Sequence, residues 1–382
     1  MTAATRPAGQ RTGRVRSARL TDLAAVGELS RVSHSPDEHP DTRVRSLGLP
    51  VSSGQISAFS LFRLPLGAFQ PHDQLYVYED RGRLTGLARV ERDAQRDEWT
   101  IVELDAVDNG DAGDIRFRLV QHLLRDASKR GAVRFHVACA DGDGNVELFM
   151  QAGFARYGEE RIYYRSPESP LPALPTDSKA GGLGIRPVVP LDAMRLDRLY
   201  RSATPAPVWR LEAYRLHDWE RQGTHWRIPR SSLTPILRFA DVEAFLQASG
   251  PDQDPEVMAF AQVGVAKADQ PHYLRVVTRP EHDPSQLVAY GLGVIAERSG
   301  GGRSGTGRSG GGRSGARAGL SDRAARGHRE VSGVLTAVRS YESPLDRRFE
   351  EQDFSMVANV ALLMKETQIR VAEPALMPVA SR

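Results

Sequence analysis

The segment Asp97–Gly131, with the sequence DEWTIVELDAVDNGDAGDIRFRLVQHLLRDASKRG, decides the fold. Thr100–Val107 is rich in β-branched and apolar residues, which predicts a strand. The turn residues of Asp108–Gly113 follow, and from Ile115 apolar residues recur at spacings of three and four, which predicts a helix. A strand, a tight turn and a helix often hold a phosphate, because free N–H groups and the helix dipole point into the turn.

The same unit occurs a second time, in Tyr273–Arg298, with the sequence YLRVVTRPEHDPSQLVAYGLGVIAER. Corresponding positions lie 170 residues apart at first and 200 apart later, and a low-complexity insert at 299–328 accounts for the difference. The matched positions are Leu104 with Leu274, Val15 with Ile185, and Phe149–Phe154 (FMQAGF) with Phe349–Phe354 (FEEQDF). The chain is therefore predicted to be a tandem repeat of about 155 residues per copy.

Length and composition agree with two domains, because 382 residues with 40% hydrophobic content suffice for two cores. We expect domains at 14–165 and 184–371, joined by a linker at 166–183 whose Pro and Gly content predicts an extended, exposed segment. The expected fold class is α+β, in which each copy has a mixed central sheet flanked by helices.

The net charge of +3 originates in the insert at 299–328, which carries six Arg against one Asp and leaves −2 for the remainder. The insert repeats Arg, Ser and Gly every five residues and is predicted to be disordered. A contact of this tract with RNA or a membrane is the less favoured alternative to a tolerated repeat expansion. The basic balance therefore does not by itself predict a nucleic-acid partner.

Three features favour a cytoplasmic protein. Cys139 is the single cysteine, so a disulfide framework is excluded. No apolar run approaches the roughly 18 residues of a membrane span. The first residues lack the hydrophobic core of a secretory signal. The sequence does not indicate an oligomeric state.

The remaining pattern predicts further elements around the two organising units. In copy one these are a strand at 15–19, helices at 21–33 and around 55–64, a hairpin of 75–79 with 84–91, a strand at 132–140, a short helix at 144–152 and a closing strand at 161–165. In copy two they are a helix at 209–222, strands at 233–248, 257–266 and 272–278, a helix at 284–297, a strand at 331–339, a short helix at 344–352 and closing strands within 354–371.

This order of elements resembles the GNAT superfamily of acyl-CoA-dependent N-acyltransferases in both copies. The most specific piece is LFMQAGFARYGEERIYY, from Leu148 to Tyr164, which is similar to the family's closing helix and strands. The resemblance implies that two parallel strands, Thr100–Val107 and Ala132–Ala140 in copy one, separate like a wedge. The pantetheine arm of acetyl-CoA would bind between them, and its pyrophosphate at the N–H groups of the next helix.

The resemblance places acetyl-CoA at the end of the first wedge strand and the start of the helix. The residues are Ala106, Val107, Ala112, Gly113, Asp114 and Ile115 in copy one, and Val276 and Val277 in copy two. Both copies depart from the family's Arg/Gln-x-x-Gly-x-Gly/Ala turn. The replacing residues are Asp111, Asp114 and Arg116 in copy one, and Glu281, Pro284 and Gln286 in copy two. Carboxylates repel a pyrophosphate, and Pro284 removes an N–H donor.

Glu103 is the candidate general base, because the family often uses a carboxylate on this strand. The competing interpretation is a solvent-facing residue, since Glu103 stands between the apolar Val102 and Leu104. Its counterpart in copy two is Tyr273.

The family often protonates the thiolate leaving group with a Tyr on the last helix. Phe149 and Phe349 occupy the corresponding positions here, and neither has a proton to give. Tyr290 and Tyr341 are possible donors in copy two, although aromatic residues at such spacing, like Trp209 and Trp219, commonly belong to a core.

Metal chemistry is not expected. The histidines His34, His39 and His72 lack metal-ligand spacing, and the DGDGN segment at 141–145 lacks the closing Glu of a calcium loop.

The predicted function is transfer of an acyl group from acetyl-CoA to an amine, either a small molecule or a protein amine. Copy one is favoured because it has Glu103 and the better closing motif. The alternative is a non-catalytic tandem protein that binds a small molecule or a protein partner.

Overall fold

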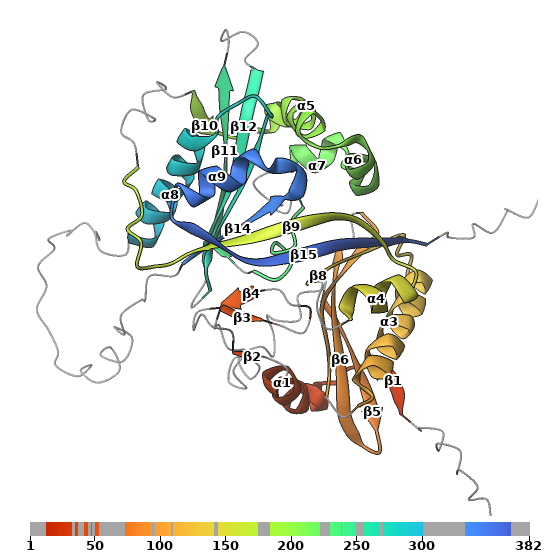
Figure 1. Ribbon diagram of the computed structural model, residues 1–382. Helices are drawn as coiled ribbons and strands as arrows, with labels where there is room; N and C mark the ends of the chain where they lie inside the picture. The colour runs from red at the N-terminus through yellow and green to blue at the C-terminus, as the bar shows by residue number, and fades with distance from the viewer. Residues whose placement is uncertain are drawn as a thin grey trace, which may run out of the picture.

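The computed structural model contains one twelve-stranded sheet that runs through both copies, together with a small sheet of β2 (Ser35–Pro36), β3 (Thr42–Val44) and β4 (Pro50–Ser52) (Figure 1). The described residues are 13–32, 35–36, 42–44, 47, 50–52, 73–93, 96–107, 110–140, 144–174, 184–221, 230–237, 239–249, 256–266, 270–300 and 333–367. Within these ranges, no helix has the length and apolarity needed to cross a membrane.

Several sequence-based predictions lie outside the described residues. They are the helix around 55–64, the three loop histidines, the insert beyond residue 300, the 175–183 part of the linker and the C-terminal tail beyond residue 367. The beginning of the linker is described, and it is held in place because Arg165 donates hydrogen bonds to the carbonyls of Ser169 (2.9 Å) and Pro170 (3.0 Å).

Copy one follows the predicted order of elements. They are β1 (Arg14–Ser17), η1 (Leu20–Asp22), α1 (Leu23–Val32), β5 (Asp73–Asp80), β6 (Arg83–Asp93), β7 (Glu98–Ala106), α3 (Ala112–Lys129), β8 (Arg134–Ala140), α4 (Asn145–Gln151) and β9 (Ala155–Arg165). The β5–β6 hairpin turns at Arg81 and Gly82, which both have positive φ. The organising strand and helix are thus β7 and α3.

Copy two repeats this order. Its elements are β10 (Ile185–Pro187), η3 (Pro190–Asp192), α5 (Ala193–Ala203), α6 (Ala206–Glu212), α7 (Leu216–Glu220), β11 (Phe239–Ser249), β12 (Glu256–Ala266), β13 (His272–Thr278), α8 (Ser285–Gly300), β14 (Val334–Arg339), η5 (Ser340–Glu342), α9 (Pro344–Glu350) and β15 (Phe354–Glu366).

Two predictions for copy two were wrong in detail. The single helix at 209–222 is two helices, because Ala213 adopts the left-handed conformation (φ 48°) that ends α6. The strand predicted to begin at Leu233 begins at Phe239. The stretch before it instead packs in a buried cluster over the central strands, through Leu233, Ile236 and Leu237. Its apolar residues are therefore buried although they do not pair as a strand.

The two copies exchange their closing strands. The sheet order is β1-β5-β6-β7-β8-β15-β9-β14-β13-β12-β11-β10. β15 of copy two lies between β8 and β9 of copy one, and β9 of copy one lies between β15 and β14 of copy two. These two strands run side by side across the middle of the molecule in Figure 1. Each copy therefore depends on the other to complete its sheet.

Pairs of contacts confirm the internal repeat. In copy one the guanidinium of Arg16 donates to both carboxylate oxygens of Asp22 (2.6 and 3.0 Å). In copy two Arg186 does the same to Asp192 (2.7 and 2.6 Å), at the offset of 170. At the offset of 200, Phe149 packs edge-on against Phe154 at 5.3 Å, and Phe349 against Phe354 at 5.1 Å.

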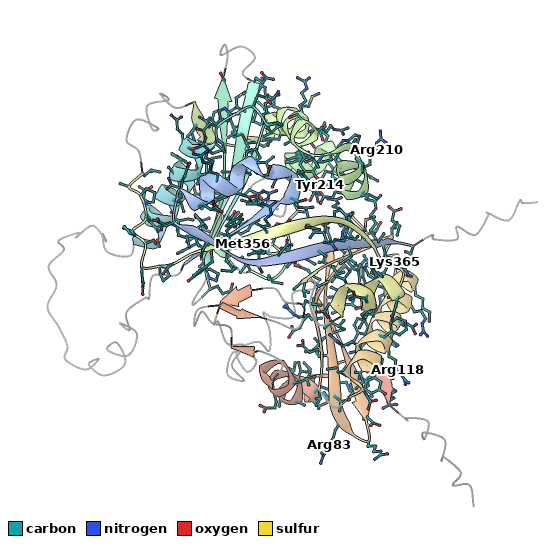
Figure 2. The ribbon with its side chains drawn as sticks, in the orientation of Figure 1. Arg83, Arg118, Arg210, Tyr214, Met356 and Lys365 are labelled. Carbon is teal, nitrogen blue, oxygen red and sulfur yellow. The ribbon has the colours of Figure 1, made fainter. Side chains whose placement is uncertain are left out.

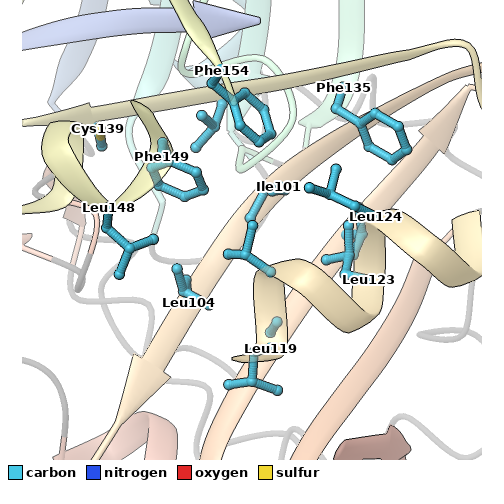
Figure 3. Close-up of a cluster of buried hydrophobic side chains, with 14 of the residues drawn as sticks. Ile101, Leu104, Leu119, Leu123, Leu124, Phe135, Cys139, Leu148, Phe149 and Phe154 are labelled. Carbon is cyan, nitrogen blue, oxygen red and sulfur yellow. The ribbon is translucent and has the colours of Figure 1, made fainter. Parts of the chain in front are cut away.

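Each copy has its own core on the face of the sheet that carries its long helix. Figure 3 shows the core of copy one, where Leu119 and Leu123 of α3 meet Ile101 and Leu104 of β7. The sheet continues between the two cores, and Figure 2 shows Met356 and Lys365 on β15 as it crosses from one copy to the other. The Lys365 ammonium donates to the Ala152 carbonyl of copy one (2.5 Å).

Candidate functional site

The wedge strands separate in both copies. In copy one, β7 and β8 pair in parallel from Glu98 with Arg134 up to Ile101 with Val137, and beyond these residues the two strands do not pair with each other. In copy two, β13 and β14 pair only at His272–Tyr273 with Val334–Leu335. The separation that the family resemblance implies is therefore present twice.

Only the copy-one wedge carries a bulge where its strands part. In the register of β6 with β7, Arg89 pairs with Glu103 and Val90 pairs with Ile101, so Val102 is an extra residue. A bulge bends its strand and redirects the following side chains. The corresponding register of β13 with β12 runs from Ala259 to Gly264 without a shift. The bulge distinguishes copy one as the site with the more specialised backbone.

Glu103 is buried, so the interpretation of a solvent-facing residue was wrong. Its side chain is 3% exposed, and Arg89 Nε donates to its Oε2 at 3.0 Å. The neighbours of Arg89, Ala88 and Val90, are buried in the core beside α3. Arg89 and Glu103 therefore lie on the other face of the sheet, which α1 covers. The interpretation failed because this strand is covered on both faces, so the face opposite Leu104 is not exposed to solvent.

The predicted acetyl-CoA residues of copy one do form a continuous strand end and helix start. Ala106 is partly buried against the core, and the Val107 N–H donates to the Thr85 carbonyl (2.9 Å). Ala112, Gly113, Asp114 and Ile115 form the first turn of α3, where Gly113 and Asp114 are exposed and Ile115 is buried. Val276 and Val277 in β13 point into different cores.

The first turn of α3 is open toward solvent. The Asp111 side chain makes no capping hydrogen bond to the helix. A Cβ added at Gly113 would meet no atom within 4 Å, so a ligand can approach the backbone there. Arg118 pairs with Asp114 at 2.8 Å, and Arg116 donates to Asn145 at 2.9 Å. These guanidinium groups offset the carboxylates that repel a phosphate.

The first turn of α8 is closed by contrast. The Asp283 carboxylate accepts hydrogen bonds from the Ser285 N–H (3.1 Å) and hydroxyl (2.6 Å). Arg348 contacts the same carboxylate at 3.1 Å. A negative group therefore already occupies the helix start in copy two, as the sequence departures indicated.

A side-chain bridge spans the copy-two wedge. Glu342 accepts a hydrogen bond from the Arg339 N–H at the end of β14 (2.9 Å) and from Arg275 of β13 (2.7 Å). Arg275 also donates to the Val276 carbonyl (2.6 Å). Burial would lower the pKa of Arg275, but the Glu342 carboxylate raises it, so the guanidinium remains charged. The bridge joins the two separated strands of this copy.

Main chain from the β3–β4 region reaches the copy-one wedge. The Ala140 N–H donates to the Leu47 carbonyl at 2.6 Å, and the Leu47 side chain is fully buried in the core. The Arg134 N–H, on the same strand β8, donates to the carbonyl of Asp97, the residue before β7 (3.4 Å), so this N–H points toward β7. Because strand N–H groups alternate in direction, the N–H of Ala140 points toward β7 as well. Leu47 therefore closes the far end of this wedge.

The aromatic candidates divide between core and junction. Phe149, Phe349 and Trp219 are buried core residues, and Tyr290 packs edge-on against Phe245 at 5.0 Å. Burial raises the pKa values of Tyr290 and Tyr341. Tyr341 lies in η5, two residues after the end of β14 in the copy-two wedge. The described residues include no group of His, Cys, Asp and Glu able to hold a metal.

Sequence reasoning missed a charged cluster at the junction of the copies. Arg230 of copy two pairs with Glu98 of β7, and Arg339 of β14 pairs with Glu160 of β9 (2.6 Å) and Glu212 of α6 (2.7 Å). Charged residues on apolar strands were the available signal. Their partners could not be read from the sequence, because Glu98 and Glu160 lie on the other copy and Glu212 is 127 positions from Arg339.

The comparisons with known proteins bear on the fold. No protein-family model matches the chain, and no curated protein matches it. A GCN5-related N-acetyltransferase from Sphaerobacter thermophilus superposes with a TM-score of 0.52 at 14% identity, covering 93% of this chain and 95% of that one.

Two further structures are similar over the same length. A tandem GNAT protein from the clavulanic acid biosynthesis pathway has a TM-score of 0.47 and 13% identity, over 93% of this chain and 98% of that chain. A putative acetyltransferase from Pyrococcus horikoshii has a TM-score of 0.47 and 10% identity, over 97% and 94%. With its internal repeat, two wedges and an α+β sheet that superposes over nearly its whole length, the chain has the tandem GNAT fold.

Proposed function

We propose that the chain is an N-acyltransferase that uses the wedge of copy one to transfer an acyl group from an acyl-CoA to an amine. One observation carries the proposal: β7 bulges at Val102 where its pairing with β8 ends, and it places the buried carboxylate of Glu103 directly after the bulge. Copy two has neither the bulge nor the carboxylate, since Tyr273 takes the place of Glu103.

The groups of copy one fit acyl-CoA at two points. Beyond Ile101 and Val137 the facing edges of β7 and β8 are not paired with each other, so a pantetheine arm would bind between them as a strand does, short of the Ala140 N–H that the Leu47 carbonyl takes. The first turn of α3, with open space at Gly113 and the guanidinium of Arg116 nearby, would take the pyrophosphate. The bound thioester would supply the activated acyl group.

Glu103 is proposed to accept the proton of the attacking amine, directly or through a water molecule. Arg89 orients the carboxylate from the neighbouring strand at 3.0 Å. Backbone N–H groups at the bulge would stabilise negative charge that develops on the carbonyl oxygen. The acceptor is proposed to be a small-molecule amine or a protein amine, because buried acidic groups on this face, Glu103 and Asp105, suit a cationic group.

Calorimetric titration with acetyl-CoA tests the proposal, combined with an acetylation assay over amino sugars, polyamines and peptide N-termini. We expect one binding site per chain. Glu103→Gln should retain binding and lose at least about a hundredfold in acetylation rate. Glu342→Gln is the matched control, because it is also a buried carboxylate paired with an arginine (2.7 Å), and it should keep the parent rate. A parent protein that binds no acyl-CoA would rule the proposal out.

A second candidate is the non-catalytic tandem protein. The observation that favours it is that both wedges already hold protein groups, Leu47 in copy one and the Arg275–Glu342 bridge in copy two. It predicts no heat of binding with acetyl-CoA or longer acyl-CoA thioesters, together with unchanged stability in their presence. The same titration therefore separates the two candidates.

A further inference from the structure

Four groups form a charged cluster at the paired end of the copy-one wedge, where β7 and β8 begin to pair and three residues before their pairing ends at Ile101. The residues that hold this paired segment therefore matter for the shape of the wedge. Glu98 of β7 lies 3.5 Å from Arg134 and 3.4 Å from His136, which are both on β8. Glu98 also pairs with Arg96 at 3.1 Å. These contacts tie β7 to β8 within the four residues of each strand that remain paired.

Arg230 completes this cluster from copy two. Its guanidinium donates to Glu98 and lies within reach of the Thr100 hydroxyl (3.4 Å), so it contacts β7 twice. Burial would raise the pKa of Glu98, but the charges of Arg230 and Arg96, with the ring of His136 close by, lower it well below its ordinary value. The carboxylate is therefore ionised and buried, and it requires its cations.

The backbone of Arg230 is fixed by copy two on both sides. Its N–H donates to the Tyr214 hydroxyl (2.6 Å), and its carbonyl accepts from Arg339 (2.9 Å). The next residues are also held, because the Ser232 N–H donates to Glu160 (2.7 Å) and Tyr273 donates to the Ser231 hydroxyl (2.8 Å). Because the backbone of Arg230 is held by copy two, its side chain fixes the position of β7 relative to copy two.

We infer that Arg230 is a positioning residue for the copy-one wedge: from the other copy, it holds the paired segment of β7 from which the wedge opens, and it thereby sets the width of the acyl-CoA slot. This inference rests on the proposed function. It also gives copy two a role in the reaction, although its own wedge is bridged by Arg275 and Glu342.

The test measures the Kd for acetyl-CoA together with thermal stability in the full chain. Loss of Arg230 alone would leave Glu98 buried without its partner and could unfold the protein. The double variant Glu98→Gln/Arg230→Gln removes both charges and avoids this effect. We expect it to fold and to bind acetyl-CoA about tenfold to a hundredfold more weakly, because small displacements of positioning groups have effects of this size.

The matched control is Arg275→Gln/Glu342→Gln, which neutralises an equally buried pair in the other wedge and should leave the Kd unchanged. Arg230→Lys is the second variant, and it should weaken binding severalfold because it keeps the charge and loses the Thr100 contact. A folded double variant with the parent Kd would overturn the inference, and so would a parent Kd in Arg230→Lys if the double variant does not fold. Absence of binding by the parent would instead refute the proposed function itself.

Discussion

Replacement of Arg339 by Met removes a cation from the centre of the junction between the copies. The side chain is 2% exposed and contacts Glu160 at 2.6 Å, Glu212 at 2.7 Å and the Arg230 carbonyl at 2.9 Å. The variant leaves two buried carboxylates without this partner. Removal of one member of a buried ion pair costs about 3–5 kcal/mol, and we expect a loss of this size in the free energy of unfolding at pH 7.5.

The loss in the free energy of unfolding should be smaller at acidic pH, and the pKa of Glu212 gives the direction of this pH dependence. In the parent, burial would raise the pKa of Glu212, but the charge of Arg339 lowers it, so its stabilising contribution is present above the ordinary value of 4.5 and disappears as the pH falls. In the variant, burial dominates and raises the pKa. A group of that kind destabilises the fold increasingly as the pH rises above about 4.5.

Urea unfolding followed by tryptophan fluorescence and circular dichroism at pH 7.5 and pH 5.0 provides the measurement. The deficit of the variant should be smaller at pH 5.0 by at least about 1 kcal/mol. Arg347→Met is the control, because Arg347 is 81% exposed in its pair with Glu351, and the change should stay below about 0.5 kcal/mol. A deficit below about 1 kcal/mol at pH 7.5, or one that grows in acid, would contradict the reasoning.

Three further predictions concern the whole fold. Because β9 and β15 are exchanged, Phe349→Ala in copy two should lower the midpoint of one unfolding transition shared by both copies, which the copy-one residue Trp99 also reports. Two separate transitions would argue that the copies do not depend on each other. Gly86→Ala should cost about 1–3 kcal/mol in chemical denaturation, since its Cβ would lie 2.5 Å from Ile115, whereas Gly113→Ala should be nearly neutral. Burial, with the charge of Arg230, lowers the pKa of His136 to about 4, so stability should fall as the pH falls from about 6.5 toward 4. His136→Gln should reduce this pH dependence when the free energy of unfolding is measured across the same pH window. An unchanged slope would show that His136 does not contribute.

The acceptor and the compartment stay predictions, because neither the fold nor its neighbours test them. Three expectations rest on the sequence reasoning alone. The acceptor is a small-molecule or protein amine, neither a membrane nor a nucleic acid is a partner, and the location is cytoplasmic. The domain boundaries at 14–165 and 184–371 also stay predictions. Because one sheet contains strands of both copies, these boundaries mark the two repeats along the chain and do not separate two sheets.

The sequence by itself determined the two copies and the elements within them. The β-branched run of Thr100–Val107 and the apolar spacing from Ile115 produced β7 and α3 as expected. These signals are local, because strand and helix periodicity depends on neighbouring residues along the chain. The repeat offsets likewise predicted matching contacts, such as the two phenylalanine pairs.

Only the tertiary structure decided which strand completes which sheet and what surrounds the wedges. Either closing strand, β9 or β15, could satisfy the edge of either copy, since backbone hydrogen bonds do not depend on sequence. The bulge at Val102 and the burial of Glu103 depend on the register of β6 with β7 and on the cover of this sheet face, and the contact of Arg230 with Glu98 joins residues 132 positions apart. Contacts of the last kind leave no periodic pattern in the chain, because they form only when the two copies have folded against each other.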